Sequence, residues 1–157
     1  MSSRPRVELD PREATRRLLD GLSSGADVVA LCGEIAELHP DRNTFPGEVY
    51  LQLAASALAR TTAAGVGPIQ YEGLRERHLA EVKLRGKENR KFQFAALCAG
   101  AIEGGLEPDL LDEVYWWRTD DFWRYALYAT VAIIRASAEA RGLTVEELVA
   151  ELSYDAG

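Results

Sequence analysis

Apolar residues recur along most of this chain at spacings of three and four, the pattern of a helix with one buried face. Val28, Leu31 and Ile35 show it clearly. The spacing predicts helices from Pro11 to a break at 21–25, then over 26–38, 47–64, 71–84, 87–103, 107–117, 119–141 and 144–152. Nowhere do apolar and polar residues alternate with β-branched enrichment between turn residues, so we expect no strands and an all-α fold.

Helix-capping residues support several of these boundaries. Asp10 before Pro11 combines an N-cap side chain with proline at the first helical position. Thr119 is a good N-cap for the helix that follows it. Thr144 and Glu147 have the spacing of a capping box, which predicts the start of the last helix.

The predicted helix 119–141 is apolar around well over half of its circumference. One row of its residues comprises Phe122, Ala126, Ala129, Ile133 and Ala136, and a second comprises Trp123, Leu127, Val131, Ile134 and Ala138. A helix of this kind is usually buried in the centre of a fold. We therefore predict a compact single-domain bundle of about 6 to 8 helices around a central apolar helix at about 120–141. Residues 1–8 and 153–157 are expected to be poorly ordered.

Composition and charge narrow the function classes. The chain has 157 residues, of which 47% are hydrophobic and 27% charged, as in a globular protein. Its longest apolar stretch, 126–134, is far shorter than the roughly 20 residues that span a bilayer, so we expect no membrane contact. The formal net charge of −7 disfavours general nucleic-acid binding.

Abundant arginine and alanine indicate a bacterial origin, and the lack of a secretory signal at the N-terminus indicates the cytoplasm. Cys32 and Cys98 lie in apolar segments, so we expect two reduced, buried thiols.

All three tryptophans fall in the aromatic cluster at 115–125, "YWWRTDDFWRY". Trp116 and Trp117 are successive residues, which point about 100° apart on a helix, so the cluster cannot all face one core. Three interpretations remain: a junction within the core, a surface for self-association, or a ligand pocket with Arg118 as a polar group.

Two blocks of opposite charge flank the predicted helix 87–103. Segment 75–91 has seven basic side chains against three glutamates, and segment 103–121 has seven acidic side chains against one arginine. The blocks are expected to form ion pairs within one chain or between two chains, or else to be an ordinary solvated surface. A further alternative is a phosphate or RNA site at Arg85, Asn89 and Arg90.

No motif for catalysis or for a cofactor occurs in the chain. His78 and Glu81 are three apart, which puts both on one face of a helix, but one such pair cannot complete a metal site. The nucleotide-binding glycine motifs, H-E-x-x-H, C-x-x-C and G-x-S-x-G are all missing. We therefore expect no metal, no cofactor and no catalysis.

The sequence thus predicts a small helical protein that acts by binding a protein partner or a second copy of itself, as a homodimer. The alternative is a small-molecule, phosphate or RNA site where segment 83–91 meets the aromatic cluster. An enzyme could also use such a site. The binding residues that these hypotheses share are Arg85, Asn89, Arg90, Trp116, Trp117, Arg118 and Trp123.

Overall fold

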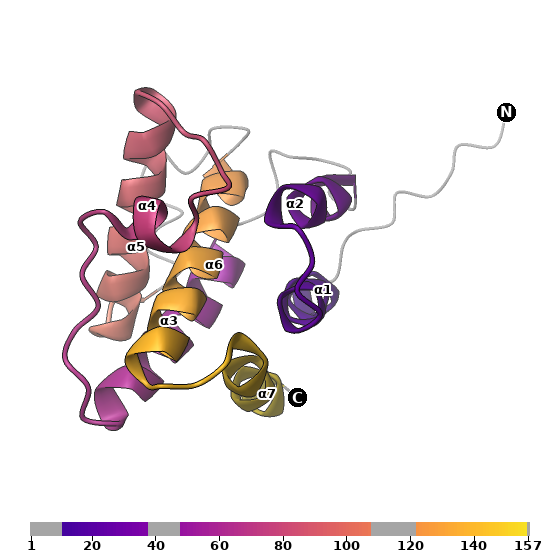
Figure 1. Ribbon diagram of the computed structural model, residues 1–157. Helices are drawn as coiled ribbons and strands as arrows, with labels where there is room; N and C mark the ends of the chain where they lie inside the picture. Colours follow the sequence, from indigo (N-terminus) through magenta and orange to yellow (C-terminus); the bar gives the residue numbers. More distant parts are fainter. Residues whose placement is uncertain (1–10, 38–47, 108–121, 157) are drawn as a thin grey trace, which may run out of the picture.

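The computed structural model describes residues 11–37, 48–107 and 122–156 (Figure 1). The described residues form seven helices and no strand, which confirms the predicted all-α fold. The helices are α1 (Pro11–Ser23), α2 (Val28–Glu37), α3 (Glu48–Ala63), α4 (Leu74–His78), α5 (Lys87–Glu103), α6 (Phe122–Ala140) and α7 (Val145–Ala156). No helix in these ranges is long and apolar enough to cross a membrane.

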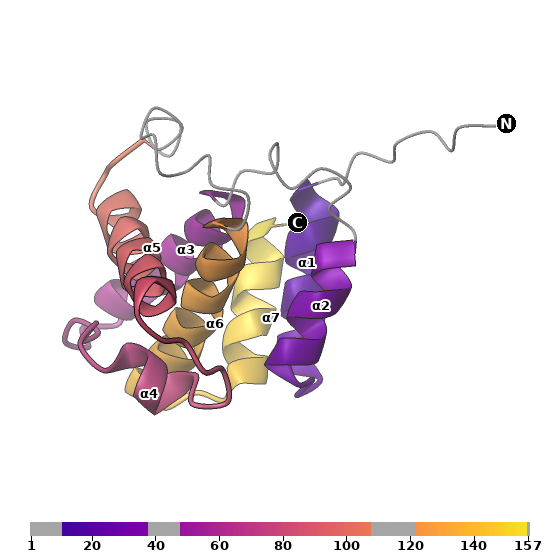
Figure 2. The ribbon, with the colours of Figure 1, turned by 90° about the horizontal axis from the view of Figure 1, so that it is seen from above.

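The helices form a bundle around α6, as predicted. Helices α2, α3, α4, α5 and α7 all contact α6, whereas α1 packs on α2, α3 and α7. Figure 2 shows α3, α4 and α5 toward one end of the bundle and α1 and α2 toward the other, with α6 and α7 between them. The predicted short helix 107–117 and the N-caps Asp10 and Thr119 lie outside the described residues.

Helix α6 is buried around almost its whole circumference, which confirms the prediction of a central apolar helix. Of its residues, Arg124 and Arg135 are half-buried and Glu139 and Ala140 exposed, and every other one is buried. Its buried alanines let neighbouring helices approach closely. The one threonine of the helix, Thr130, keeps its hydroxyl oxygen 2.8 Å from the carbonyl oxygens of both Ala126 and Tyr50. A buried polar group is therefore satisfied where α3 crosses α6.

The prediction of one helix over 71–84 is wrong, because only Leu74–His78 is helical in that range. Leu74, Leu79, Val82 and Leu84 are all buried. At 100° per residue they would spread over most of the circumference of a straight helix, so one face could not bury all four. The chain instead leaves the helix after His78 and turns each of these apolar side chains inward.

Two arginines satisfy carbonyl groups that the irregular chain exposes. Arg75 Nη1 donates to the Val82 carbonyl at 3.0 Å, and Arg135 Nη1 of α6 donates to the His78 carbonyl at 2.9 Å. Buried backbone groups need such partners wherever a helix is interrupted. One side chain from the predicted basic block, Arg75, and one from α6, Arg135, thus stabilise a turn of the backbone.

The ends of the helices match the sequence in part. In the predicted capping box, Thr144 N donates to Glu147 Oε1 at 3.0 Å and Glu147 N donates to Thr144 Oγ1 at 3.1 Å, which confirms it. Helix α2 begins two residues later than predicted, because Asp27 Oδ2 accepts a hydrogen bond from Ala30 N and caps the helix there. Helix α7 continues to Ala156, beyond the predicted end at about 152, since no glycine or proline interrupts it.

Both cysteines are buried and free, as predicted. Burial raises the pKa of the Cys98 thiol to about 11. Burial also raises the pKa of Cys32, against a hydrogen bond with Tyr128 that lowers it. Both side chains therefore stay protonated at neutral pH and act as small apolar groups.

Gly21 tests how tightly α1 packs on α2. A Cβ at this position would lie 2.6 Å from both terminal carbons of the buried Leu31. We expect Gly21→Ala to lower the free energy of unfolding by about 1 kcal/mol, because overpacking outweighs the gain in helix propensity. Urea denaturation measures this change.

The matched control is Gly33→Ala in α2, where a Cβ meets nothing within 4 Å. It should raise the free energy of unfolding by about 0.5–1 kcal/mol, because alanine is the better helix former. Equal stabilisation by the two substitutions would contradict the close contact between α1 and α2.

Candidate functional site

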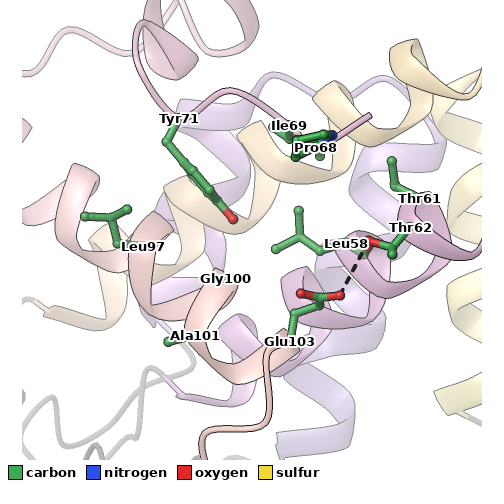
Figure 3. A pocket seen from close by; sticks show the side chains of 10 residues that line it. All are labelled: Leu58, Thr61, Thr62, Pro68, Ile69, Tyr71, Leu97, Gly100, Ala101 and Glu103. Carbon is green, nitrogen blue, oxygen red and sulfur yellow. Dashed lines mark hydrogen bonds between the residues drawn. The ribbon is translucent and has the colours of Figure 1, made fainter. Parts of the chain in front are cut away.

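A pocket of about 420 Å³ opens between the C-terminal halves of α3 and α5 and the segment 68–71 (Figure 3). Its lining residues are Leu58, Thr61, Thr62, Pro68, Ile69, Tyr71, Leu97, Gly100, Ala101 and Glu103. None of these lining residues belongs to segment 83–91 or to the described residues 122–125 of the aromatic cluster, where the sequence predicted binding.

Three separate parts of the chain form the apolar walls. Leu58 comes from α3, Ile69 from the connection between α3 and α4, and Leu97 from α5. Leu58 is buried, whereas Leu97 is 56% exposed, which is unusual for a leucine beside a pocket. The walls thus offer apolar surface that remains in contact with water.

Gly100 makes room for the hydroxyl group of Tyr71. A Cβ on Gly100 would lie 2.5 Å from the Tyr71 hydroxyl oxygen, closer than atoms of this kind approach. The missing side chain therefore allows the Tyr71 ring to lie against α5 with its hydroxyl turned into the pocket (Figure 3). Glycine within a helix lowers stability relative to alanine. Here the close approach of Tyr71 explains why a glycine occupies this position.

The polar end of the pocket consists of Glu103, Thr62 and Tyr71. Thr62 Oγ1 lies 3.1 Å from the Leu58 carbonyl oxygen and 3.5 Å from Glu103 Oε1. Burial and the neighbouring Glu103 carboxylate raise the pKa of Tyr71, so its phenol is neutral at neutral pH. Thr61 is buried and its hydroxyl lies 2.8 Å from the Ala57 carbonyl oxygen of the same helix, which leaves it a structural role.

This arrangement suits binding. Ligand pockets of about 300–1,000 Å³ are mostly apolar, and a few convergent polar groups orient the ligand in them. The volume lies within that range, and a carboxylate, a phenol and a threonine hydroxyl are among the lining groups. The pocket can therefore hold an apolar body and hydrogen-bond a polar head.

The residues of the predicted basic site, Arg85, Asn89 and Arg90, all lie within the described residues. Arg85 precedes α5 and Arg90 lies in its first turns, and both are exposed. Asn89 Oδ1 accepts a hydrogen bond from Arg75 Nε at 3.3 Å, beside the bond from Arg75 to the Val82 carbonyl. Asn89 thus orients a structural arginine, and phosphate binding at Arg85 and Arg90 stays a prediction.

The aromatic cluster lies only partly within the described residues, because Trp116, Trp117 and Arg118 fall outside them. Trp123 is 2% exposed, and Arg124 lies 6.0 Å from its ring. This placement does not fit the expectation that Trp123 belongs to a binding surface. It favours the core interpretation for this residue, because it follows the apolar side of α6.

Tyr125 joins the basic start of α5 to α6. Its hydroxyl donates to Glu88 Oε2 at 3.3 Å, and Lys91 Nζ lies 5.3 Å from the centre of its ring. A cation over an aromatic face is attracted to it. Part of the basic block therefore holds two helices together.

The His78 and Glu81 side chains both contact charged side chains of α6. Among the described residues no group of three or more His, Cys, Asp or Glu side chains could hold a metal ion. Glu81 accepts a hydrogen bond from Arg135 instead, and His78 Nδ1 lies 3.5 Å from Glu139 Oε2. Both side chains help to hold the region of α4 against α6.

The pairing of the two charge blocks stays a prediction, because most of segment 103–121 lies outside the described residues. Within the basic block, Arg75 Nη2 lies 3.0 Å from Glu76 Oε1. Glu103, at the start of the acidic block, contacts Thr62 in the pocket.

The sequence missed the pocket because its residues come from three segments with no shared motif. Gly100, alone within an apolar helix, was the one local signal.

No protein-family model matches this chain, and neither a curated protein nor a solved structure matches it. We therefore infer the ligand class of the pocket from the chemistry of its own side chains.

His78 should make stability depend on pH. Burial lowers the pKa of His78 below its usual 6.5, and Arg77 and Arg135 lower it further, against Glu139, which raises it. The unfolded chain then binds the proton more tightly than the folded chain does. The contribution of neutral His78 is complete above pH 6.5 and is lost as the pH falls below it.

We expect the free energy of unfolding to fall between about pH 7.5 and pH 5.5, and to fall less in His78→Asn. Urea denaturation across this range measures the slope. An unchanged slope in His78→Asn would contradict the assigned shift.

Proposed function

We propose that this chain is a binding protein that holds a small organic molecule in the pocket between α3, α5 and segment 68–71. The observation that carries the proposal is the convergence of apolar walls from three elements with three oxygen-bearing side chains at one end. The sequence analysis predicts binding of a protein partner or a second copy, and it gives small-molecule binding as the alternative, at segment 83–91 beside the aromatic cluster.

Leu97 supports the proposal energetically. Its side chain is 56% exposed at the pocket, so a ligand that covers it removes apolar surface from water. Complete burial of a leucine side chain stabilises by about 1.5–3 kcal/mol, and half of that is available here. A ligand with a phenyl ring or a short alkyl chain would gain this energy against Leu97, Ile69 and Leu58.

The polar groups of the pocket support binding more than chemistry. Thr61 and Thr62 have hydroxyls near carbonyl oxygens of their own helix, and Glu103 is exposed to water. Among the described lining residues there is no cysteine, serine, lysine or histidine to serve as a nucleophile beside a base. These groups are suited to orient a ligand.

A second proposal is the self-association that the sequence predicts. The observation that favours it is the exposed Leu97, because a second copy that covered this side chain would also bury the rim of the pocket. Sedimentation velocity at micromolar concentration tests it: Leu97→Asp should shift a dimer toward the monomer, and a monomeric natural protein would exclude it.

We further propose a cytoplasmic bacterial setting, which two free thiols favour.

Thermal unfolding with a panel of small compounds tests the binding proposal. The panel contains aromatic and aliphatic amines, alcohols and carboxylates, together with inorganic phosphate and nucleotides. A ligand at 100 times its Kd stabilises the folded state by about 2.7 kcal/mol, which should raise Tm by about 5–10 °C for a chain of this size.

Ala101→Phe should abolish the shift, because Ala101 lines the pocket and a phenyl ring there would fill it. Ala150→Phe on the exposed side of α7 is the matched control and should keep the shift. A shift that survives Ala101→Phe, or a panel without any shift, would contradict the proposal. A shift from phosphates alone, abolished by Arg85→Ala with Arg90→Ala, would favour the basic segment instead.

A further inference from the structure

We infer that the pocket prefers a ligand with a protonated amine next to its apolar body, and that Glu103 is the counter-ion of this amine. The inference rests on the proposed function and names the ligand class of the same site. It follows from the charge, the acceptor atoms and the position of Glu103 at the end of α5.

Glu103 is a carboxylate with spare capacity to accept hydrogen bonds. Among the described residues its one hydrogen bond is with Thr62 Oγ1 at 3.5 Å, which is the long limit for such a bond. Other acids in the described residues have cations: Glu151 lies 2.9 Å from Arg60 and 3.0 Å from Arg141. No basic side chain in the described ranges forms such a pair with Glu103. A cationic ligand would supply the missing partner.

The position of Glu103 makes this end of the pocket negative. Glu103 is the last residue of α5, and the last turn of this helix contains no basic residue. The C-terminal end of a helix has a partial negative charge, which favours cations there. A glutamate at this place adds negative charge to negative charge, so a bound cation would relieve an unfavourable arrangement within the protein.

Three oxygen atoms from three elements can receive the amine. Figure 3 shows the Tyr71 hydroxyl and the Glu103 carboxylate turned toward the same space, with Thr62 hydrogen-bonded to Glu103. An ammonium group has three donors and no acceptor, which matches a set of acceptor oxygens. The raised pKa of Tyr71 keeps its oxygen neutral, so the site has one full negative charge and suits one positive charge.

The same features disfavour anionic ligands. A carboxylate or phosphate in the pocket would face Glu103 without a basic side chain beside it among the described residues. The basic residues Lys87, Arg90 and Lys91 lie at the opposite end of α5. At 1.5 Å per residue, this 17-residue helix is about 25 Å long, so these charges lie far from Glu103.

Isothermal titration of three matched compounds at pH 7 tests the inference: 2-phenylethylamine, 2-phenylethanol and phenylacetate. They share a phenyl ring on a short chain and differ in the charge of the head. We expect the amine to bind about tenfold more tightly than the alcohol, and the carboxylate to bind most weakly. Glu103→Gln should remove the preference for the amine over the alcohol, because it removes the negative charge that distinguishes the two heads.

Glu72→Gln is the matched control, because Glu72 is exposed next to Tyr71 but does not line the pocket. It should keep the preference for the amine. Circular dichroism checks that both variants fold, which is expected because both carboxylates are exposed.

Three outcomes would overturn the inference: equal binding of amine and alcohol, a preference that survives Glu103→Gln, or no binding of the amine. In the first two outcomes the proposed function is still supported, provided that Ala101→Phe abolishes the binding. In the third, the proposed function fails only if no compound of the wider panel raises Tm.

Discussion

Burial of α6 on nearly all sides is the interaction on which the rest of the structure depends. Five helices contact this one helix directly, and α1 reaches the bundle through its neighbours. The buried alanines of α6 allow close approach, and Thr130 satisfies its hydroxyl at the crossing with α3. A helix with apolar residues all around is stable in water only if other helices cover it, so α6 requires the bundle.

The pocket forms where the chain leaves this central packing. Segment 68–71 leads from α3 toward α4 and passes beside α5, and its apolar residues contact the outer parts of both helices. Gly100 lets Tyr71 approach the backbone of α5, and Leu97 remains exposed nearby. The result is an apolar recess with one carboxylate, which adjoins the core at the buried Leu58.

The sequence was informative where local chemistry decides local structure. The period of apolar residues predicted α2, α3, α5 and α6 closely, and the Thr144–Glu147 capping box is present. It failed over 71–84, because guanidinium groups from Arg75 and Arg135 satisfy the backbone there and allow an irregular chain. Long-range contacts of this kind leave no periodic signal in the sequence.

The same limit applies to the site. Asn89 was predicted to bind a ligand, whereas it accepts a hydrogen bond from Arg75 of the protein itself. The pocket residues extend from position 58 to position 103 and share no motif, so only the folded chain brings Glu103 next to Thr62. The sequence gives the charge of each residue. It does not show which charged side chains contact other parts of the protein and which remain available to a ligand.

The most direct test of the binding site is nuclear magnetic resonance of the protein with 2-phenylethylamine, with the methyl groups of leucine, isoleucine and valine labelled. The account predicts intermolecular Overhauser effects from the phenyl protons to the methyl groups of Leu58, Ile69 and Leu97. Effects confined to other methyl groups, such as those of the exposed Val29 on α2, would contradict it.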